Sequence, residues 1–202
     1  MRIHSLRLLR GLGAKDLIGY LYPRIFSLHN MPEEVPSRSH LEILRCQAGF
    51  PDKTGQFVLP PIVRATRQTL EDSGAYLLEN GQTMILYLGR HVVPLLLNDL
   101  FGPLCNALAD LDFQMTVPPP LDTPISIQLR NTIAYINETR PSRALCIQIA
   151  RATMDGAEHE FSSLLVEDRN NEAQAYGEYL PYLHRQINME VFYDHLRVKL
   201  GD

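Results

Sequence analysis

A two-stranded antiparallel hairpin is the sequence feature that most constrains the fold. Apolar and β-favouring residues fill Ala75–Glu79 and again Thr83–Leu88. Between them, Asn80-Gly81 tolerates positive φ at both central positions, as a type I′ turn requires. The second segment contains a run of apolar residues without polar alternation. Because such a strand is buried on both faces, we predict a central strand with helices above and below the sheet.

Two helices and a further strand follow the hairpin. Pro94 is tolerated near the first turn of a helix, which we expect over residues 91–101. A longer helix begins at Thr123-Pro124, where the hydroxyl can cap the N-terminus and proline fits the first helical position. Its apolar residues share one face at helical spacing: Ile125, Leu129, Ile133 and Ile136. Alternating apolar residues predict a strand over 144–150.

The segment before the hairpin is less regular. Apolar spacing predicts a helix over 3–21, which ends before a proline. Residues 30–60 are rich in proline, glycine and charge, so we expect an irregular connection with a short strand at Phe57–Leu59. Thr66 can cap a short helix that continues to Leu70.

The last fifty residues contain one ambiguous run and a helical end. Phe161–Val166 is apolar and fits either a short helix or a short strand. Apolar spacing predicts a helix over 176–187 and an amphipathic continuation over 189–200. Pro181 interrupts the first pattern, so that helix either starts late or is kinked. The elements together predict an α/β (α+β) fold, a mixed sheet flanked by helices.

Composition narrows the classes of function. The net charge of −4 indicates no broad surface for nucleic acid. The chain has only three cysteines, which favours a reduced, intracellular protein over a disulfide scaffold. No apolar run approaches the length that spans a bilayer. The first thirty residues carry a net charge of +4, which could meet anionic lipid, but a solvated helix face or a transit peptide would have the same composition.

No motif in the sequence specifies catalysis or a metal site. Gly11–Lys15 lacks the spacing of a phosphate-binding loop and follows a predicted helix where a strand is required. The seven histidines show no zinc-type spacing, so we interpret them as surface or interface residues. Glu167-Asp168-Arg169 is the best polar cluster, and we expect these residues to pair locally or to cap the next helix. We therefore predict no catalytic, cofactor-binding or metal-binding residues, and no enzyme.

The order and spacing of several motifs resemble a known family. The motifs are GAYLLENGQTMILYLG from Gly74, LFG from Leu100, LRNTIAYINETRPSRALCIQIA from Leu129, FSSLLVEDRN from Phe161 and YLPYLHRQI from Tyr179. Together with YPRIFSLHNM from Tyr22, they are similar to the C-terminal part of the cargo-adaptor subunit of the COPII vesicle coat, the Sec24 family. The resemblance covers essentially the whole chain.

The resemblance implies a division of the chain. Residues 55–172 would form a gelsolin-like domain, a mixed sheet between a long helix over 124–139 and a shorter one. Residues 1–30 and 173–202 would belong to a helical domain, with 31–54 as the connecting loop. The family's zinc finger lies outside this chain, so no zinc is expected.

The resemblance also bears on calcium. Gelsolin-type modules use an aspartate directly before the Ala-Tyr of the first hairpin strand as a calcium ligand, and here that position is Gly74. Asp72 and Asp99 are the only carboxylates expected nearby, fewer than the six to eight oxygen ligands that calcium prefers. We therefore expect no calcium site of that type.

The expected function follows from the resemblance. It implies a non-catalytic COPII component acting in transport from the endoplasmic reticulum to the Golgi, in the cytoplasm at the cytosolic face of the endoplasmic reticulum. Implied partners are the GTPase-activating coat subunit, other coat proteins, cargo membrane proteins and the membrane surface, with no nucleic acid. Cargo and partner contacts cannot be assigned to residues. The alternatives are a gelsolin-type actin-binding module and the gelsolin-like region of the GTPase-activating subunit. Exposed apolar surface on the two helical ends would favour dimers of the chain.

Overall fold

The computed structural model describes residues 17–19, 22–31, 47–52, 54–112, 114–139, 145–168 and 176–200. Residues 17–19 are helical, and the rest of the helix predicted over 3–21 lies outside the described residues. Most of the predicted connection over 30–60 also lies outside them, as do Gly11–Lys15 and Arg169.

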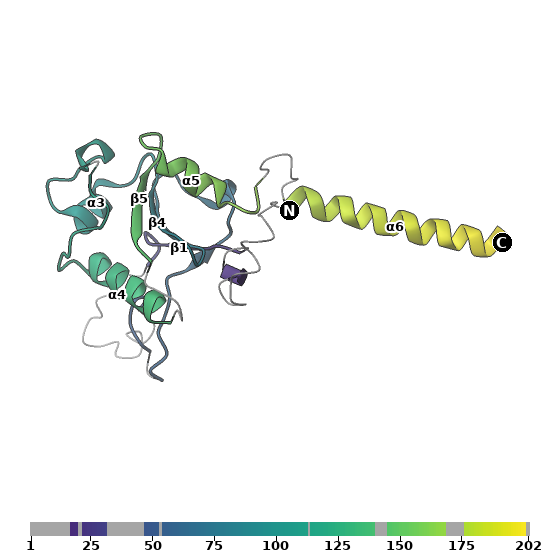
Figure 1. Ribbon diagram of the computed structural model, residues 1–202, viewed down its shortest axis with the longest axis horizontal. Helices are drawn as coiled ribbons and strands as arrows, with labels where there is room; N and C mark the ends of the chain where they lie inside the picture. The colour runs from purple at the N-terminus through teal and green to yellow at the C-terminus, as the bar shows by residue number, and fades with distance from the viewer. Residues whose placement is uncertain are drawn as a thin grey trace, which may run out of the picture.

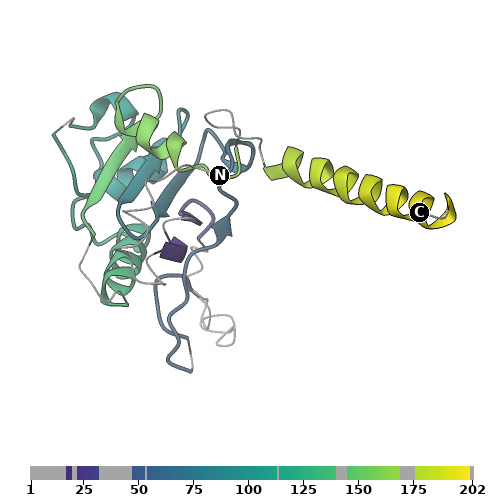
Figure 2. The same ribbon diagram turned by 45° about the vertical axis from the view of Figure 1, so that its right-hand side comes forward.

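A five-stranded mixed sheet forms the centre of the molecule, in the order β2-β1-β3-β4-β5. The strands are β1 (Arg24–Ser27), β2 (Ile62–Val63), β3 (Ala75–Glu79), β4 (Met84–Leu88) and β5 (Ile147–Arg151). The β4–β5 pair is parallel and all other pairs are antiparallel. Figure 2 shows β5 at one margin of the sheet. Every residue of β3 and β4 is buried, which confirms the prediction of a central strand pair.

The hairpin is present, but its turn differs from the prediction. Glu79 pairs with Met84, so the hairpin is centred between Gly81 and Gln82, one residue further along the chain than an Asn80-Gly81 turn would place it. Asn80 N–H donates to the carbonyl of Thr83, which makes Gly81 and Gln82 the central pair. Of the turn residues only Gly81 has positive φ, at 88°, whereas a type I′ turn requires positive φ at both central residues. The predicted type I′ turn is wrong because the Asn80 side chain, which accepts from the N–H groups of Gln82 and Thr83, stabilises the other geometry.

Helices cover both faces of the sheet. Figure 1 shows α4 (Pro124–Glu138) and α5 (Ala157–Ser163) on opposite sides, with α3 (Pro94–Phe101) beside α4. The α3–α4 side holds the larger apolar core, which includes Leu86, Leu97 and Leu129. The α5 side holds a second core centred on the stacked rings of Tyr87 and Phe161, 4.1 Å apart. The sheet is therefore the middle layer of three, as predicted.

The predicted start of α4 is confirmed, whereas α3 begins at Pro94, three residues later than the predicted residue 91. Pro94 occupies the first turn of α3, and Pro124 that of α4. The hydroxyl of Thr123 accepts a hydrogen bond from the N–H of Ser126 at 3.4 Å, so it caps α4. The ambiguous run Phe161–Val166 resolves as helical at its start, because Phe161 lies within α5.

The proposed boundary between the helical and gelsolin-like parts is wrong for β1. Arg24–Ser27 was assigned to a helical segment, yet it is a strand that pairs with both β2 and β3. Ile25 and Phe26 are completely buried, one on each face of the sheet. The sheet unit therefore begins at or before Arg24, about thirty residues earlier than the predicted residue 55. The other limits stay predictions.

Phe57–Leu59 was predicted as a strand and is not one. Phe57 makes a single bridge to Pro51, within a small loop over residues 49–58. The loop packs on α4: the ring of Phe57 stacks on Tyr135 at 4.2 Å. The Gln128 amide also donates to the carbonyl of Ala48. Antiparallel backbone hydrogen bonds, from Gly49 N–H to the Val58 carbonyl at 2.8 Å and from Val58 N–H to the Phe50 carbonyl at 3.0 Å, and the contacts with α4 together order this segment.

The chain ends in one long helix, α6 (Tyr176–Leu200), with Pro181 inside it. The helix starts at Tyr176, before Pro181, and is not divided. The helices predicted over 176–187 and 189–200 therefore form one helix. Side chains are described for residues 177–190, and all of these are exposed. Figure 1 shows α6 extending away from the sheet. No helix in the described parts of the chain is long and apolar enough to cross a membrane.

Candidate functional site

The Glu167-Asp168 cluster contacts a segment one hundred residues earlier in the chain. Asp168 accepts from the hydroxyl of Thr66 and, at 2.7 Å, from the backbone N–H of Arg67. Glu167 accepts from the guanidinium of Arg64 at 2.7 Å. The expected pairing with local residues or the next helix is therefore wrong. Asp168 instead caps the short helix η2 (Arg67–Thr69), and Thr66 donates to Asp168 rather than capping that helix itself.

Arg67 connects this cluster to the α5 side of the sheet. Its guanidinium donates to the hydroxyl of Tyr87 at 2.7 Å and lies 5.5 Å from the centre of that ring. It also lies 3.9 Å from the carboxylate of Glu158 and 4.0 Å from that of Asp72. The Arg67 side chain is 44% exposed, so the two ion pairs contribute little to stability. Because its donors are shared among three partners, Arg67 ties η2 to β4 and α5.

Burial raises the pKa of Tyr87, and the hydrogen bond from Arg67 opposes that effect. Burial also raises the pKa of Tyr76, whose hydroxyl oxygen accepts from the N–H of Glu71 at 2.6 Å. Both tyrosines therefore stay neutral at physiological pH. A neutral phenol held by an arginine or a backbone N–H is a structural contact, and neither group is activated as a base or nucleophile.

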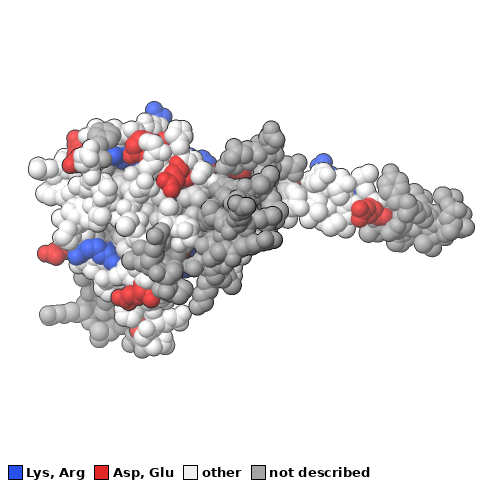
Figure 3. Space-filling model, in the orientation of Figure 1, with Lys and Arg blue, Asp and Glu red and all other residues white. Residues whose placement is uncertain are grey.

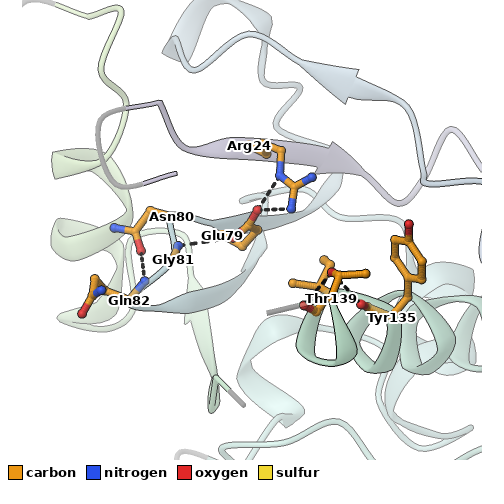
Figure 4. A network of polar contacts seen from close by, with 8 residues as sticks. Arg24, Glu79, Asn80, Gly81, Gln82, Tyr135 and Thr139 are labelled. Atoms are coloured by element: carbon orange, nitrogen blue, oxygen red, sulfur yellow. Dashed lines mark hydrogen bonds and ion pairs between the residues drawn. The ribbon is translucent and has the colours of Figure 1, made fainter. Parts of the chain in front are cut away.

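A second polar network lies at the hairpin end of the sheet. The carboxylate of Glu79, which is 1% exposed, pairs with the guanidinium of Arg24 from the neighbouring strand β1. Glu79 also accepts from the N–H of Gly81 at 3.3 Å. Figure 4 shows the pair and the turn side by side. The arrangement neutralises a buried charge and ties β1 to the hairpin.

Gly74 occupies the position where a calcium ligand was considered. A Cβ added there would lie 2.5 Å from the ring of His29 and 2.9 Å from that of Tyr76. A carboxylate at residue 74 would therefore have to displace the His29 ring. Asp72 lies beside Arg67, while the backbone carbonyl of Asp99 accepts from the Thr123 hydroxyl on α4. Nothing in the described part of the chain gathers three or more His, Cys, Asp or Glu side chains in metal-binding geometry.

Three of the four histidines with described side chains lie at the surface, as predicted, and His29 does not. His91, His159 and His184 are exposed. His29 packs edge-on against Tyr76, with ring centres 5.0 Å apart, and lies 3.6 Å from the carboxylate of Glu71. His4, His40 and His195 lie outside the residues with described side chains.

The exposed surface is the remaining candidate for function. Figure 3 shows a face with few charged side chains over the sheet unit. Large apolar side chains are exposed in and next to α3 and along α6: Val93, Leu95, Leu104, Tyr179, Leu180, Tyr182, Leu183, Ile187 and Met189. No nucleophile, base and oxyanion-binding group converge among the described residues. The geometry supports binding through surfaces.

Sequence reasoning missed the contacts that hold these surfaces in place. Arg67 and Asp168 meet across 101 residues of sequence, and Arg24 and Glu79 across 55. No local pattern marks either pair, since each depends on how the strands are ordered in the sheet.

Comparison with known proteins gives a consistent relationship. The family model described as a gelsolin repeat matches residues 56–123. The SEC24 protein of Coccidioides immitis is 30% identical over 194 residues, covering 93% of this chain and 19% of that protein. The SEC24 protein of Yarrowia lipolytica has the same identity and coverage. A Neosartorya fischeri SEC24 protein is 41% identical over 103 residues, 50% of this chain and 10% of that protein.

A solved structure agrees with the sequence relatives. The crystal structure of the human COPII-coat protein Sec24c superposes with a TM-score of 0.67 and 25% identity, covering 89% of this chain and 21% of that one. The chain spans about a fifth of the length of the relatives that it matches. The chain is therefore similar to Sec24 proteins along 93% of its length, and the mixed sheet with its helices agrees with this similarity.

Proposed function

We propose that this chain is the sheet-bearing part of a COPII cargo adaptor and works without catalysis in transport from the endoplasmic reticulum to the Golgi. The observation that carries the proposal is similarity to Sec24 proteins along 93% of the chain. The described polar clusters support it, because each one joins strands and helices of the fold instead of forming an open reactive site.

The partners and location belong to the same proposal. We expect the full-length protein to bind the GTPase-activating coat subunit, other coat proteins and cargo membrane proteins, and to bind no nucleic acid. It would lie in the cytoplasm, at the cytosolic face of the endoplasmic reticulum and on COPII vesicles. We further propose that this chain holds no cofactor and no calcium, because His29 and Tyr76 fill the space beside Gly74.

A chimera tests the adaptor proposal. The corresponding segment of the Yarrowia lipolytica SEC24 protein is replaced by this chain, in cells depleted of their own SEC24. We expect the chimera to restore secretion of a reporter protein and to co-purify with the GTPase-activating coat subunit.

The matched control is the same chimera carrying Ala150→Asp, which places a charge in the fully buried α5-side core and prevents folding. A stable, well-expressed chimera that secretes no better than this control would contradict the proposal.

Two alternatives have their own tests, and the SEC24 relatives favour neither. An actin-binding module would sediment with filamentous actin. The gelsolin-like region of a GTPase-activating subunit would accelerate GTP hydrolysis by the coat GTPase. The adaptor proposal expects no effect in either assay.

A further inference from the structure

One imidazole closes the end of the ladder between β1 and β3. Leu28, directly after β1, donates its N–H to the carbonyl of Ala75 at 2.9 Å. In a regular antiparallel ladder, the N–H of Ala75 would return a hydrogen bond to the carbonyl of Leu28. Here that carbonyl accepts from the N–H of Met31 at 3.3 Å, and the N–H of Ala75 donates to Nδ1 of His29, also at 3.3 Å. A side chain therefore completes the backbone pairing.

This hydrogen bond requires one protonation state of the ring. A ring nitrogen that accepts from an N–H group carries a lone pair and no proton. His29 is therefore neutral in this arrangement, with its proton on Nε2, which lies 3.6 Å from the carboxylate of Glu71. A proton on Nδ1 would place two N–H groups 3.3 Å apart and facing each other. The N–H of Ala75 would then lose its acceptor.

A charged ring has other partners within reach. Nδ1 also lies 3.3 Å from the carbonyl oxygen of Ala75 and 3.3 Å from the hydroxyl oxygen of Ser27, and both oxygens can accept from an N–H group. Nε2 faces the carboxylate of Glu71, whose side chain is 63% exposed. Protonation therefore exchanges one set of contacts for another, because the ring stops accepting from β3 and pairs as a cation with Glu71.

The packing holds the ring where both sets of contacts can form. The His29 side chain is only 14% exposed and packs edge-on against Tyr76, with ring centres 5.0 Å apart. A Cβ at Gly74 would come within 2.5 Å of it. Glu71 and Tyr76 are the titratable groups found to face the ring in the described part of the chain. Burial raises the pKa of Tyr76, which stays neutral between about pH 5 and 8, the range in which imidazoles titrate.

We propose that His29 is a proton-sensitive latch at the corner where β1 ends and β3 begins. The neutral ring closes the ladder through Ala75. The protonated ring releases that amide and pairs with Glu71, in the turn over residues 70–74 that joins η2 to β3. Because imidazoles change charge between about pH 5 and 8, a local fall in pH loosens this corner. The latch does not depend on the adaptor proposal.

Nitrogen-15 NMR of the imidazole tests the neutral state. At about pH 8, the chemical shifts of the two ring nitrogens show which of them carries the proton. We expect His29 to carry it on Nε2. A neutral ring with its proton on Nδ1 would donate to the Ala75 carbonyl in both charge states. That result would overturn the proposal.

Amide exchange of Ala75 follows the latch. Its protection factor, which corrects for the intrinsic pH dependence of exchange, should fall by about fivefold between pH 8 and pH 5, because the amide loses its acceptor. Leu77 is the internal control, since it is the next amide of β3 that faces β1, opposite Phe26. Its protection should not change. Equal falls at both amides would show general loosening of the sheet and would count against the latch.

Two histidine variants separate the latch from nearby charge. His29→Asn supplies a side-chain oxygen that accepts without titrating, so protection of Ala75 should be the same at both pH values. His91→Asn is the matched control. His91 is exposed, and its backbone N–H donates to the Asp72 carbonyl in the same turn at 2.7 Å. This variant should keep the original pH dependence. A pH effect that persists in His29→Asn, or disappears in His91→Asn, would refute the assignment to His29.

Glu71→Gln tests the charged state in a variant that keeps the ring. The substitution is on an exposed side chain and retains the backbone N–H that donates to the Tyr76 hydroxyl. Without the carboxylate, the protonated ring loses its charge partner. At about pH 6, the ratio of open to closed Ala75 amide should therefore be about two- to fivefold smaller. An unchanged ratio would contradict the pairing with Glu71. All these readouts use the chain itself, so they can fail while the adaptor proposal holds.

Discussion

The carboxylate of Asp168 accepts a hydrogen bond from the backbone N–H of Arg67 at 2.7 Å and closes a contact between segments 101 residues apart. Asp168 caps η2 with a side chain from a distant part of the chain. The contact holds the end of the sheet unit beside the segment that follows β2. Several measurable consequences follow from this and the related contacts.

Asp168→Ala should lower the free energy of unfolding by about 1–2 kcal/mol, because the cap of η2 and the partner of the Thr66 hydroxyl are both lost. Urea unfolding of the chain measures the change. Asp168→Asn retains one accepting oxygen and should cost less than half as much. Equal stability of the alanine variant and the unaltered chain would show that the contact contributes nothing.

Gly81→Val should destabilise the chain by about 1–2 kcal/mol, because φ at this position is 88° and a β-branched residue is strained there. Gln82→Val is the matched control and should be nearly neutral, because Gln82 is not among the residues with positive φ. Thermal unfolding compares the two. Equal losses in the two variants would show that the positive φ at residue 81 does not cause the destabilisation.

Arg24→Met should cost roughly 2 kcal/mol, because it leaves the carboxylate of Glu79 buried without its arginine partner. This loss is smaller than the roughly 3–5 kcal/mol typical of breaking a fully buried ion pair, because the Arg24 side chain is 42% exposed. The double variant Arg24→Met, Glu79→Met should regain much of that stability. A double-mutant cycle in urea measures the coupling, and strictly additive effects would show that the two side chains do not interact.

Gly74→Asp should destabilise the chain and should not create calcium binding, because the ring of His29 occupies the space of the new Cβ. Ser73→Asp is the control: it adds the same charge at a neighbouring position that already carries a Cβ. Calorimetry with calcium and the melting temperature provide the two readouts. Micromolar calcium binding by the unaltered chain or by Gly74→Asp would refute the proposed absence of this site.

Alkaline stability should depend on Tyr87. Burial raises its pKa in the folded chain above the ordinary value of 10, so the folded state binds the phenol proton more tightly than the unfolded state. The resulting stabilisation is complete below about pH 10 and is lost as pH rises from there through the folded-state pKa. Between about pH 8 and 11, the urea midpoint of Tyr87→Phe should therefore fall less steeply with rising pH than that of the unaltered chain. Tyr179→Phe, on exposed α6, should keep the original slope.

The central hairpin and the long helix could be predicted because their signals are local. The unbroken apolar run from Met84 requires burial on both faces wherever the strand lies. Thr123 and Pro124 fix the start of α4 through contacts within one turn. The family resemblance, carried by motifs along the whole chain, was likewise a property of the sequence and was confirmed by the SEC24 relatives.

The turn, β1 and the Asp168 contact could not be predicted in this way. The Asn80-Gly81 pair suits two turns, and the side chain of Asn80 together with the strand register selects between them. Arg24–Ser27 is too short to specify a strand, and it becomes one because β3 offers an unpaired side.

The sequence by itself determined which segments are apolar, where α4 begins and which family the chain resembles, since these depend on neighbouring residues and on motifs along the chain. Only the tertiary structure decided that β1 joins the sheet, that Asp168 caps η2 and that β5 is the last strand of the sheet. Those outcomes depend on strand order, which brings together residues far apart in the chain.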